Sequence, residues 1–333
     1  MGNPLRLLIT GATGAVGPTL VREAISSQYL IRTLSLDQPY GLFEQDVEAR
    51  QGDITNPETV YRAMQGIDLV VHLAALLHIA DPPASMEEKY FRINVEGTRN
   101  VMQAAVASGV KRVVYPSTIA VYNDSSGRII TEKTVPHPDT WYTRTKLEAE
   151  RIVLDAKDDD GKPLGGVLRL GTVYGARIKG NYQKLLHALA RGMFIPIGKG
   201  SNRRTLIYDK DVARAVLLGL SHPGAAGKIY NVSDGTYHTL NQIIEVMCSA
   251  LSRPMPKISV PEGPVRVVSG LVEWVSKLIG IHPPISRSMV DKYTEDMAVD
   301  SSMIRSELGF MPEYDLSRGW GETIDLMRRA GEL

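Results

Sequence analysis

The chain has 333 residues, enough for one large domain or two joined ones with a sizeable core. Its 38 Lys and Arg nearly balance its 37 Asp and Glu, so its net charge does not draw it to nucleic acid or acidic membranes. A single cysteine, Cys248, excludes an internal disulfide and favours a reducing, cytoplasmic location. No charged-then-apolar leader precedes the first predicted strand, and we therefore expect no signal peptide.

In the first half of the chain, short apolar strands alternate with helices, which predicts a parallel sheet covered by helices. Strands are predicted at 5–10, 31–36, 47–51, 69–73, 111–115 and 166–170, and helices at 17–27, 56–64, 94–108 and 141–155. Later helices are predicted at 182–191, 209–220 and 240–251. A buried strand at 228–232 is expected to return to the sheet.

Residues 265–281 are the most membrane-like stretch of the sequence. Arg266, Glu273 and Lys277 interrupt it, and it is shorter than a spanning helix requires. Its spacing predicts an amphipathic helix packed on the C-terminal part, with contact to a membrane surface or a partner as the alternative. We expect no stable membrane insertion.

The first strand leads into a glycine-rich loop, Thr10-Gly11-Ala12-Thr13-Gly14-Ala15-Val16-Gly17. Glycines in such a turn let the backbone approach a pyrophosphate, and the N–H groups at the helix start favour the anion. Asp37 follows twenty positions after Gly17 at the end of the second strand. A tight turn alone is the alternative, but the two features together favour a dinucleotide. The Asp37 carboxylate would bind ribose hydroxyls and repel a 2′-phosphate, which favours NAD over NADP.

Tyr142 and Lys146 lie four residues apart on a predicted helix and therefore share a face. A free tyrosine is a poor base, with a pKa near 10. A neighbouring ammonium lowers the pKa of a phenol, so we expect Lys146 to bring Tyr142 toward acid–base use. The alternative is a surface pair without function.

Together with these motifs, several further stretches make the chain resemble the extended short-chain dehydrogenase/reductase family, in its NAD-dependent epimerase/dehydratase branch. They are 52–55, 72–75, 94–98, 117–122, 169–175 and 204–213. The resemblance covers nearly the whole chain. It implies an α/β fold, with a Rossmann-type doubly wound parallel sheet and a smaller mixed C-terminal substrate-binding domain. Residues 1–172 would form the NAD-binding domain, to which the chain returns around 206–233, and residues 173–205 and 234–333 the substrate-binding domain.

The resemblance also implies roles for single residues. Thr118, Tyr142 and Lys146 would be catalytic: Thr118 would hydrogen-bond the reacting oxygen, Tyr142 would be the general acid/base, and Lys146 would hold the nicotinamide ribose. The NAD site would comprise Gly11, Thr13, Gly14, Ala15, Val16, Gly17, Asp37, Asp53, Ile54, Leu73, Ala74, Ala75, Asn94, Tyr142 and Lys146. The substrate would contact Thr118, Thr172 and Arg204, with Arg204 gripping a nucleotide-sugar pyrophosphate. A salt bridge from Arg204 to Asp209 or Asp211 is the alternative.

Members that dehydrate sugars resemble one another in carrying Asp-Glu directly after the catalytic Thr. Here Ile119 and Ala120 stand at those places, which argues against a 4,6-dehydratase. We therefore expect an NAD-dependent UDP-sugar 4-epimerase that works through a 4-keto intermediate. Alternatives are a 4-keto-sugar reductase, a dehydrogenase or reductase of a non-sugar alcohol or ketone, and a non-catalytic NAD-binding protein. His72 and His78 lack further ligands at metal spacing, so we expect no metal. The resemblance also implies a homodimer formed by the helices 94–108 and 141–155.

Overall fold

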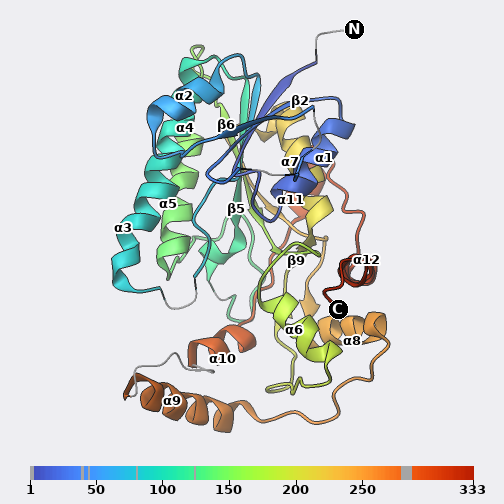
Figure 1. Ribbon diagram of the computed structural model, residues 1–333. Coiled ribbons are helices and arrows are strands. Elements are labelled where there is room, and N and C mark those ends of the chain that lie inside the picture. The colour runs from blue at the N-terminus through green and yellow to red at the C-terminus, as the bar shows by residue number, and fades with distance from the viewer. Residues whose placement is uncertain (1–3, 39–40, 44–45, 80–81, 124, 279–286) are drawn as a thin grey trace.

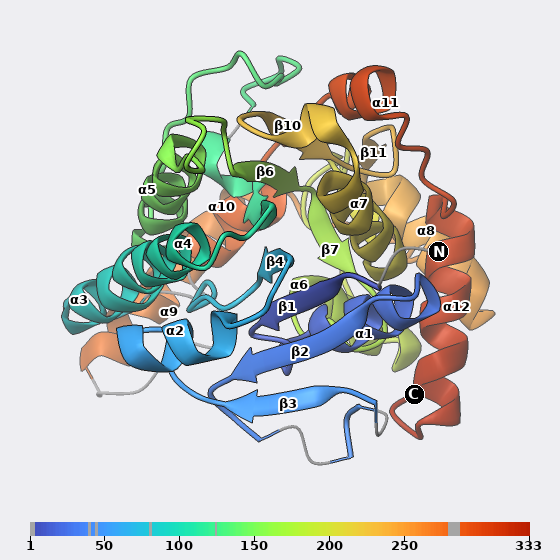
Figure 2. The same cartoon turned by 90° about the horizontal axis from the view of Figure 1, so that it is seen from above.

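A computed structural model describes residues 4–38, 41–43, 46–79, 82–123, 125–278 and 287–333. Its centre is a seven-stranded parallel sheet with the spatial order β10-β6-β5-β4-β1-β2-β3 (Figure 2). The strands are β1 (Arg6–Thr10), β2 (Leu30–Ser35), β3 (Glu48–Gln51), β4 (Leu69–His72), β5 (Arg112–Thr118), β6 (Gly165–Leu170) and β10 (Ile229–Val232). The strand order changes direction between β1 and β4, which is where doubly wound folds bind ligands. The predicted fold class is thus confirmed.

Helices cover both faces of the sheet (Figure 1). One face packs on α1 (Gly17–Ser26), α7 (Asp209–Ser221) and α11 (Ser302–Leu308). The other packs on α2 (Pro57–Met64), α4 (Gly97–Ala107) and α5 (Trp141–Asp155). Each layer forms an apolar cluster with the sheet, because the strands at its centre, β1, β4, β5 and β6, are buried on both sides.

The C-terminal part contributes a third apolar cluster, which surrounds Tyr174 and Trp320. It is formed mainly by α6 (Asn181–Ala190), α8 (Leu240–Leu251) and α12 (Leu316–Arg329). Cys248 is buried in this cluster, as expected for a structural thiol. The remaining elements are β7 (Thr172–Tyr174) with β9 (Leu206–Tyr208), β8 (Arg203–Arg204) with β11 (His238–Thr239), α3 (Glu87–Tyr90), α9 (Glu262–Leu278), α10 (Arg287–Thr294), and short turns of helix at η1 (Ala84–Met86), η2 (Phe91–Glu96), η3 (Ile119–Tyr122) and η4 (Pro223–Ala225).

Most predicted elements are confirmed to within a few residues, including the return of the chain to the sheet as β10 beside β6. The predicted end of β5 at Tyr115 is wrong, since β5 continues to pair with β6 as far as Thr118. The helix predicted at 94–108 instead begins as the π-helical turn η2 and continues as α4. The last residues of the helix predicted at 265–281 lie outside the described residues. Among the helices that are described, none is long and apolar enough to cross a membrane.

Candidate active site

Thr118 is the last residue of β5 and the N-cap of η3. Its Oγ1 accepts a hydrogen bond from the Ala120 N–H at 3.1 Å. A hydroxyl that accepts from the backbone keeps its own proton for another acceptor. The Thr118 hydroxyl therefore keeps a proton that it could donate at the carboxyl edge of the sheet.

A capping box sets the start of α5. The Oγ1 of Thr140 accepts from the Thr143 N–H, and the Oγ1 of Thr143 accepts from the Thr140 N–H at 3.1 Å. This start places Tyr142 in the first turn and Lys146 one turn later, so the two residues face the same side of the helix. Because α5 packs against β5 and η3, this side faces the edge of the sheet that carries Thr118.

Lys146 is buried, and its Nζ donates to the Pro116 carbonyl at 2.8 Å. Pro116 is tolerated inside the sheet because it lies beyond Val114, the last residue of β5 that pairs with β4. The ammonium also lies 3.9 Å from the centre of the Tyr115 ring, a favourable cation–π distance. Burial lowers the pKa of Lys146 to about 7, although the nearby Glu150 carboxylate opposes this shift.

The expectation that Lys146 lowers the pKa of Tyr142 is wrong for this structure. Burial raises the pKa of Tyr142 to about 12, and the neighbouring Tyr90 adds to the rise. The Lys146 ammonium instead interacts with the Pro116 carbonyl. The His78 ring meets the Tyr142 ring edge-on at a centroid distance of 6.2 Å.

A chain of hydrogen bonds beneath the site gives His72 a single tautomer. The Thr98 hydroxyl donates to the Asn94 carbonyl at 2.6 Å, so its oxygen accepts from His72 Nε2–H at 3.0 Å. His72 Nδ1 then accepts from the Thr10 hydroxyl at 2.7 Å, and Thr10 Oγ1 accepts from the Ala74 N–H. Burial lowers the pKa of His72 to about 3, which agrees with a neutral ring. His72 is thus a structural residue that connects β1, β4 and α4.

The Asn94 amide connects the chain after β4 to α5. Its Oδ1 accepts from the Leu76 N–H at 2.7 Å, and its Nδ2 donates to the Leu76 carbonyl and to Thr145 Oγ1, each at 3.1 Å. Thr145 directly precedes Lys146. Asn94 therefore holds the segment that contains Leu73, Ala74 and Ala75 at a fixed distance from the Tyr142 helix.

The glycine loop fits the dinucleotide that the sequence predicts. Gly11 has φ +70°, and a Cβ there would lie 2.6 Å from the Ala74 backbone. Gly14 is exposed, and a Cβ on it would meet only the Gly11 carbonyl, at 3.1 Å. The N-terminus of α1 at Gly17 has no side-chain cap and no acidic residue in its first turn. Its N–H groups therefore suit an anion, and the backbone of Thr13, Ala15 and Val16 leads directly into them.

Three further residues predicted for NAD lie at the carboxyl ends of strands. Asp37 is exposed two residues after β2, and Asp53 is exposed two residues after β3. The Asp53 carboxylate accepts from the Thr55 N–H at 2.8 Å. The side chain of Ile54 is buried against Gly97, and its carbonyl accepts from Asn100, which leaves the N–H as the group with which Ile54 would contact an adenine.

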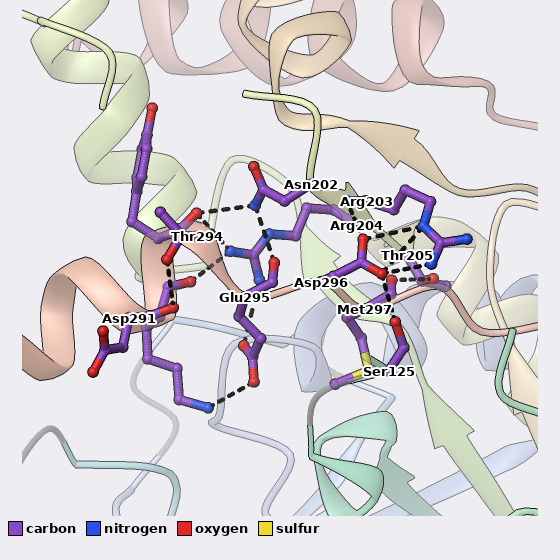
Figure 3. A network of polar contacts seen from close by, with 12 residues as sticks. Ser125, Asn202, Arg203, Arg204, Thr205, Asp291, Thr294, Glu295, Asp296 and Met297 are labelled. Carbon is purple, nitrogen blue, oxygen red and sulfur yellow. Dashed lines mark hydrogen bonds and ion pairs between the residues drawn. The ribbon is translucent and has the colours of Figure 1, made fainter. Parts of the chain in front are cut away.

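Arg204, predicted to grip a pyrophosphate, lies against the C-terminus of α10 (Figure 3). Its Nη2 donates to the carbonyls of Lys292 at 2.5 Å and Tyr293 at 3.0 Å, and its Nη1 lies 3.4 Å from Glu295 Oε2. Its carboxylate partner is therefore Glu295 rather than Asp209 or Asp211. Glu295 gave no signal in the sequence, because 91 positions separate it from Arg204.

The residues on either side of Arg204 are structural. Arg203 forms an ion pair with Asp296, with Nη2 2.5 Å from Oδ2, and the pKa of Asp296 is strongly lowered, chiefly by hydrogen bonds from Arg203 and Ser125 that outweigh burial. Thr205 Oγ1 donates to the Met297 carbonyl at 2.9 Å. These contacts fix β8 to the segment after α10 (Figure 3). Thr172, predicted to contact substrate, is exposed at the start of β7.

Sequence reasoning missed Glu150, which lies one turn after Lys146 on α5. It is buried, accepts from the Ser117 hydroxyl at 2.5 Å and pairs with Arg169 of β6 at 2.6 Å. The four-residue spacing of Glu150 from Lys146 on the predicted helix was the feature of the sequence that could have drawn attention to it. In the described residues, no cluster of His, Cys, Asp and Glu suits a metal.

Comparison with known proteins gives the family. Residues 7–233 match the model of the NAD dependent epimerase/dehydratase family. The N-acetyl-alpha-D-glucosaminyl-diphospho-ditrans,octacis-undecaprenol 4-epimerase of Escherichia coli O157:H7 is 28% identical over 96% of this chain and 94% of its own. The UDP-glucose 4-epimerase of Vibrio cholerae is 28% identical over 98% and 97%. Other relatives are 3 beta-hydroxysteroid dehydrogenases at about 26% identity, so family likeness alone leaves the substrate open.

Solved structures have the same fold. MoeE5 in complex with UDP-glucuronic acid and NAD superimposes with a TM-score of 0.76 and 26% identity, covering 98% of this chain and 99% of MoeE5. NAD suits the glycine loop, the free N-terminus of α1 and the Tyr142–Lys146 pair described above. The chain therefore belongs to the NAD dependent epimerase/dehydratase family and is an enzyme that uses NAD.

Proposed function

We propose that the protein epimerises C4 of a nucleotide sugar, specifically a UDP-sugar, and keeps NAD bound throughout. The observation that carries the proposal is the site at the end of β5. Thr118 there has a free hydroxyl proton beside the Tyr142 face of α5, whereas the next positions hold a buried isoleucine and an alanine, Ile119 and Ala120. Apolar side chains cannot protonate a leaving hydroxyl, which favours epimerisation over dehydration. The 4-epimerases among the relatives and the UDP-sugar complex of MoeE5 support this choice.

In this proposal Tyr142 Oη accepts the proton of the sugar 4-hydroxyl and later returns it, while the Thr118 hydroxyl donates a hydrogen bond to the same oxygen. Bound NAD would supply the reversible hydride acceptor for C4, and the positive charge of its nicotinamide would favour the phenolate of Tyr142. Lys146 holds the nicotinamide ribose. The ribose hydroxyl oxygens would give its ammonium further acceptors, which favours the charged form beside Tyr142.

We further propose that residues 173–205 and 234–333 form the substrate lobe and that Arg204 binds the diphosphate there. A phosphate would replace the Glu295 carboxylate as the anionic partner of the guanidinium. Because Lys292 also binds Glu295, at 3.1 Å, the carboxylate keeps a cationic partner after the exchange.

The test is to incubate the purified protein with UDP-glucose, UDP-galactose and their N-acetyl forms without added cofactor, and to separate the products. Interconversion at constant total nucleotide sugar supports a 4-epimerase with resident NAD. The Tyr142→Phe variant should lose the activity by a factor of about 10² to 10⁴ while keeping NAD. If no sugar is converted until NADH or NADPH and a 4-keto sugar are supplied, the protein is a reductase and the proposal is wrong.

A further inference from the structure

Helix α9 buries two serines and leaves large apolar side chains exposed. Ser269 and Ser276, seven residues apart, are buried, whereas Val267 and Trp274, also seven apart, are each 62% exposed. Val268 is exposed beside them. Residues seven apart lie on one face of a helix, so α9 presents an apolar stripe to its surroundings. An ordinary surface helix has the opposite arrangement.

The contacts of α9 with the neighbouring helix α10 include charged groups. Helix α10 packs on α9 and brings the guanidinium of Arg287 against Gly270. Arg266 forms an ion pair with Asp291 of α10, with Nε 3.2 Å from Oδ1. Val267, Val268 and Trp274 remain exposed although α10 packs on α9, so this packing does not account for them. Their exposure therefore calls for another partner.

Two connecting segments, 191–199 and 252–261, extend this apolar surface. They are bonded to each other through Val260, whose N–H donates to the Pro196 carbonyl and whose carbonyl accepts from the Gly198 N–H, both at 2.9 Å. Segment 252–261 leads directly into α9 at the lower end of Figure 1. The exposed apolar side chains of the two segments are Met193, Ile195, Met255 and Ile258, with Ile258 reaching 75%.

The same two segments carry only positive charge. Arg191, Lys199, Arg253 and Lys257 are exposed and interleave with the apolar side chains, and neither segment contains Asp or Glu. Within the described part of the chain, none of these four side chains forms an ion pair. Interleaved basic and apolar groups complement an anionic lipid surface, which binds cations at its headgroups and apolar side chains just below them.

We propose that α9 and the segments 191–199 and 252–261 dock on an anionic lipid bilayer, with α9 lying in the plane of the headgroups. Trp274, with an apolar body and one N–H donor, suits that boundary. A second copy of this chain is a poorer partner, because a two-fold contact turns the same patch of both copies toward each other and brings two positively charged surfaces together. Because Arg204 binds the carbonyls at the end of α10, the docked surface is linked directly to the residue proposed to bind the diphosphate.

The proposal concerns a surface and is tested without any substrate. The measurement is co-sedimentation with lipid vesicles at low and at high salt. One set of vesicles contains phosphatidylcholine alone, and the other contains phosphatidylcholine with phosphatidylglycerol. The full-length protein should bind the anionic vesicles, less so at high salt, and binding should shift the emission of Trp274 to shorter wavelength. Two double variants should each weaken vesicle binding by about tenfold or more. They are Val267→Ser/Trp274→Ser and Arg253→Glu/Lys257→Glu.

Met311→Ser and Arg329→Glu serve as matched controls, because both residues are exposed outside this surface, and they should bind like the unmodified protein. All six positions are exposed, and equal melting temperatures would show that the variants fold. No binding to anionic vesicles, or binding that neither pair weakens, would overturn the proposal. So would a dimer, detected by light scattering, that the Val267→Ser/Trp274→Ser pair abolishes while vesicles are not bound.

Discussion

Arg169 and Glu150 form a bidentate ion pair in the interior, with Nη2 2.6 Å from Oε2 and Nε 3.1 Å from both carboxylate oxygens. Glu150 lies four residues after Lys146, the spacing at which a helical Lys and Glu pair with each other. Because Arg169 holds the carboxylate, Lys146 donates to Pro116 instead. The buried pair thus leaves the ammonium on the side of α5 that carries Tyr142.

Removing one member of this ion pair should strongly destabilise the folded protein. Arg169→Met leaves the Glu150 carboxylate buried with only Ser117 to bind it, and we expect the free energy of unfolding to fall by about 3–5 kcal/mol in urea denaturation. The double variant Arg169→Met/Glu150→Gln removes both charges and should recover part of that loss. A double variant no more stable than Arg169→Met would contradict this account of the pair.

The stability of the protein should depend on His72 in mild acid. The pKa of His72 is about 3 in the folded protein, against an ordinary value of 6.5, so only the unfolded chain binds a proton between these values. Stability is therefore fully present above about pH 6.5 and is lost as pH falls, by about 1.4 kcal/mol per pH unit. Urea denaturation from pH 7 to 5 should show this slope relative to His72→Gln. Equal slopes in the two proteins would refute the neutral, buried imidazole.

NAD binding should depend on the space above Gly14. Gly14→Ala meets only one carbonyl of the protein, so we expect its melting temperature to change little and its affinity for NAD, measured by calorimetry, to fall about tenfold or more. Gly66→Ala is the control, since Gly66 has φ +70° with open space around it. It should lower stability modestly and leave NAD binding intact. The reverse pattern would show that the loop does not cradle the cofactor.

The homodimer implied by the family resemblance makes a separate prediction. A groove at the junction of η2 and α5 is lined by Phe91, Val95 and Trp141, and Phe91 is 46% exposed. Phe91→Asp should convert the dimer into a monomer, as measured by light scattering. Ile129→Asp is the control and should leave the dimer intact, because Ile129 is exposed outside this groove. A protein that is monomeric without substitution would remove this expectation.

Local patterns in the sequence were sufficient for the fold and for the residues at the ends of strands. Alternating apolar strands and helices predicted the sheet, and helical spacing predicted that Tyr142 and Lys146 share a face. Contacts between distant residues were not accessible, because the partners of Arg169 and Arg204 are determined by the tertiary fold. The same holds for α9: its amphipathic pattern was visible, but which side chains would be exposed depended on how the helix packs in the fold.

The sign of the Tyr142 pKa shift was also beyond the sequence. Spacing alone suggested that an ammonium would lower it, whereas the depth of burial, which raises it to about 12, follows only from the packing of α5 against the sheet.

The most direct test of the proposed chemistry is to give the enzyme a UDP-sugar labelled with deuterium at C4, without added cofactor, and to analyse the epimeric product by mass spectrometry. Transfer of the hydride to bound NAD and back predicts that the product keeps the deuterium at C4, and that unlabelled NADH in the solution does not dilute it. Loss of the label to solvent, its dilution by added NADH, or the absence of any epimer would contradict epimerisation at C4 by a resident cofactor.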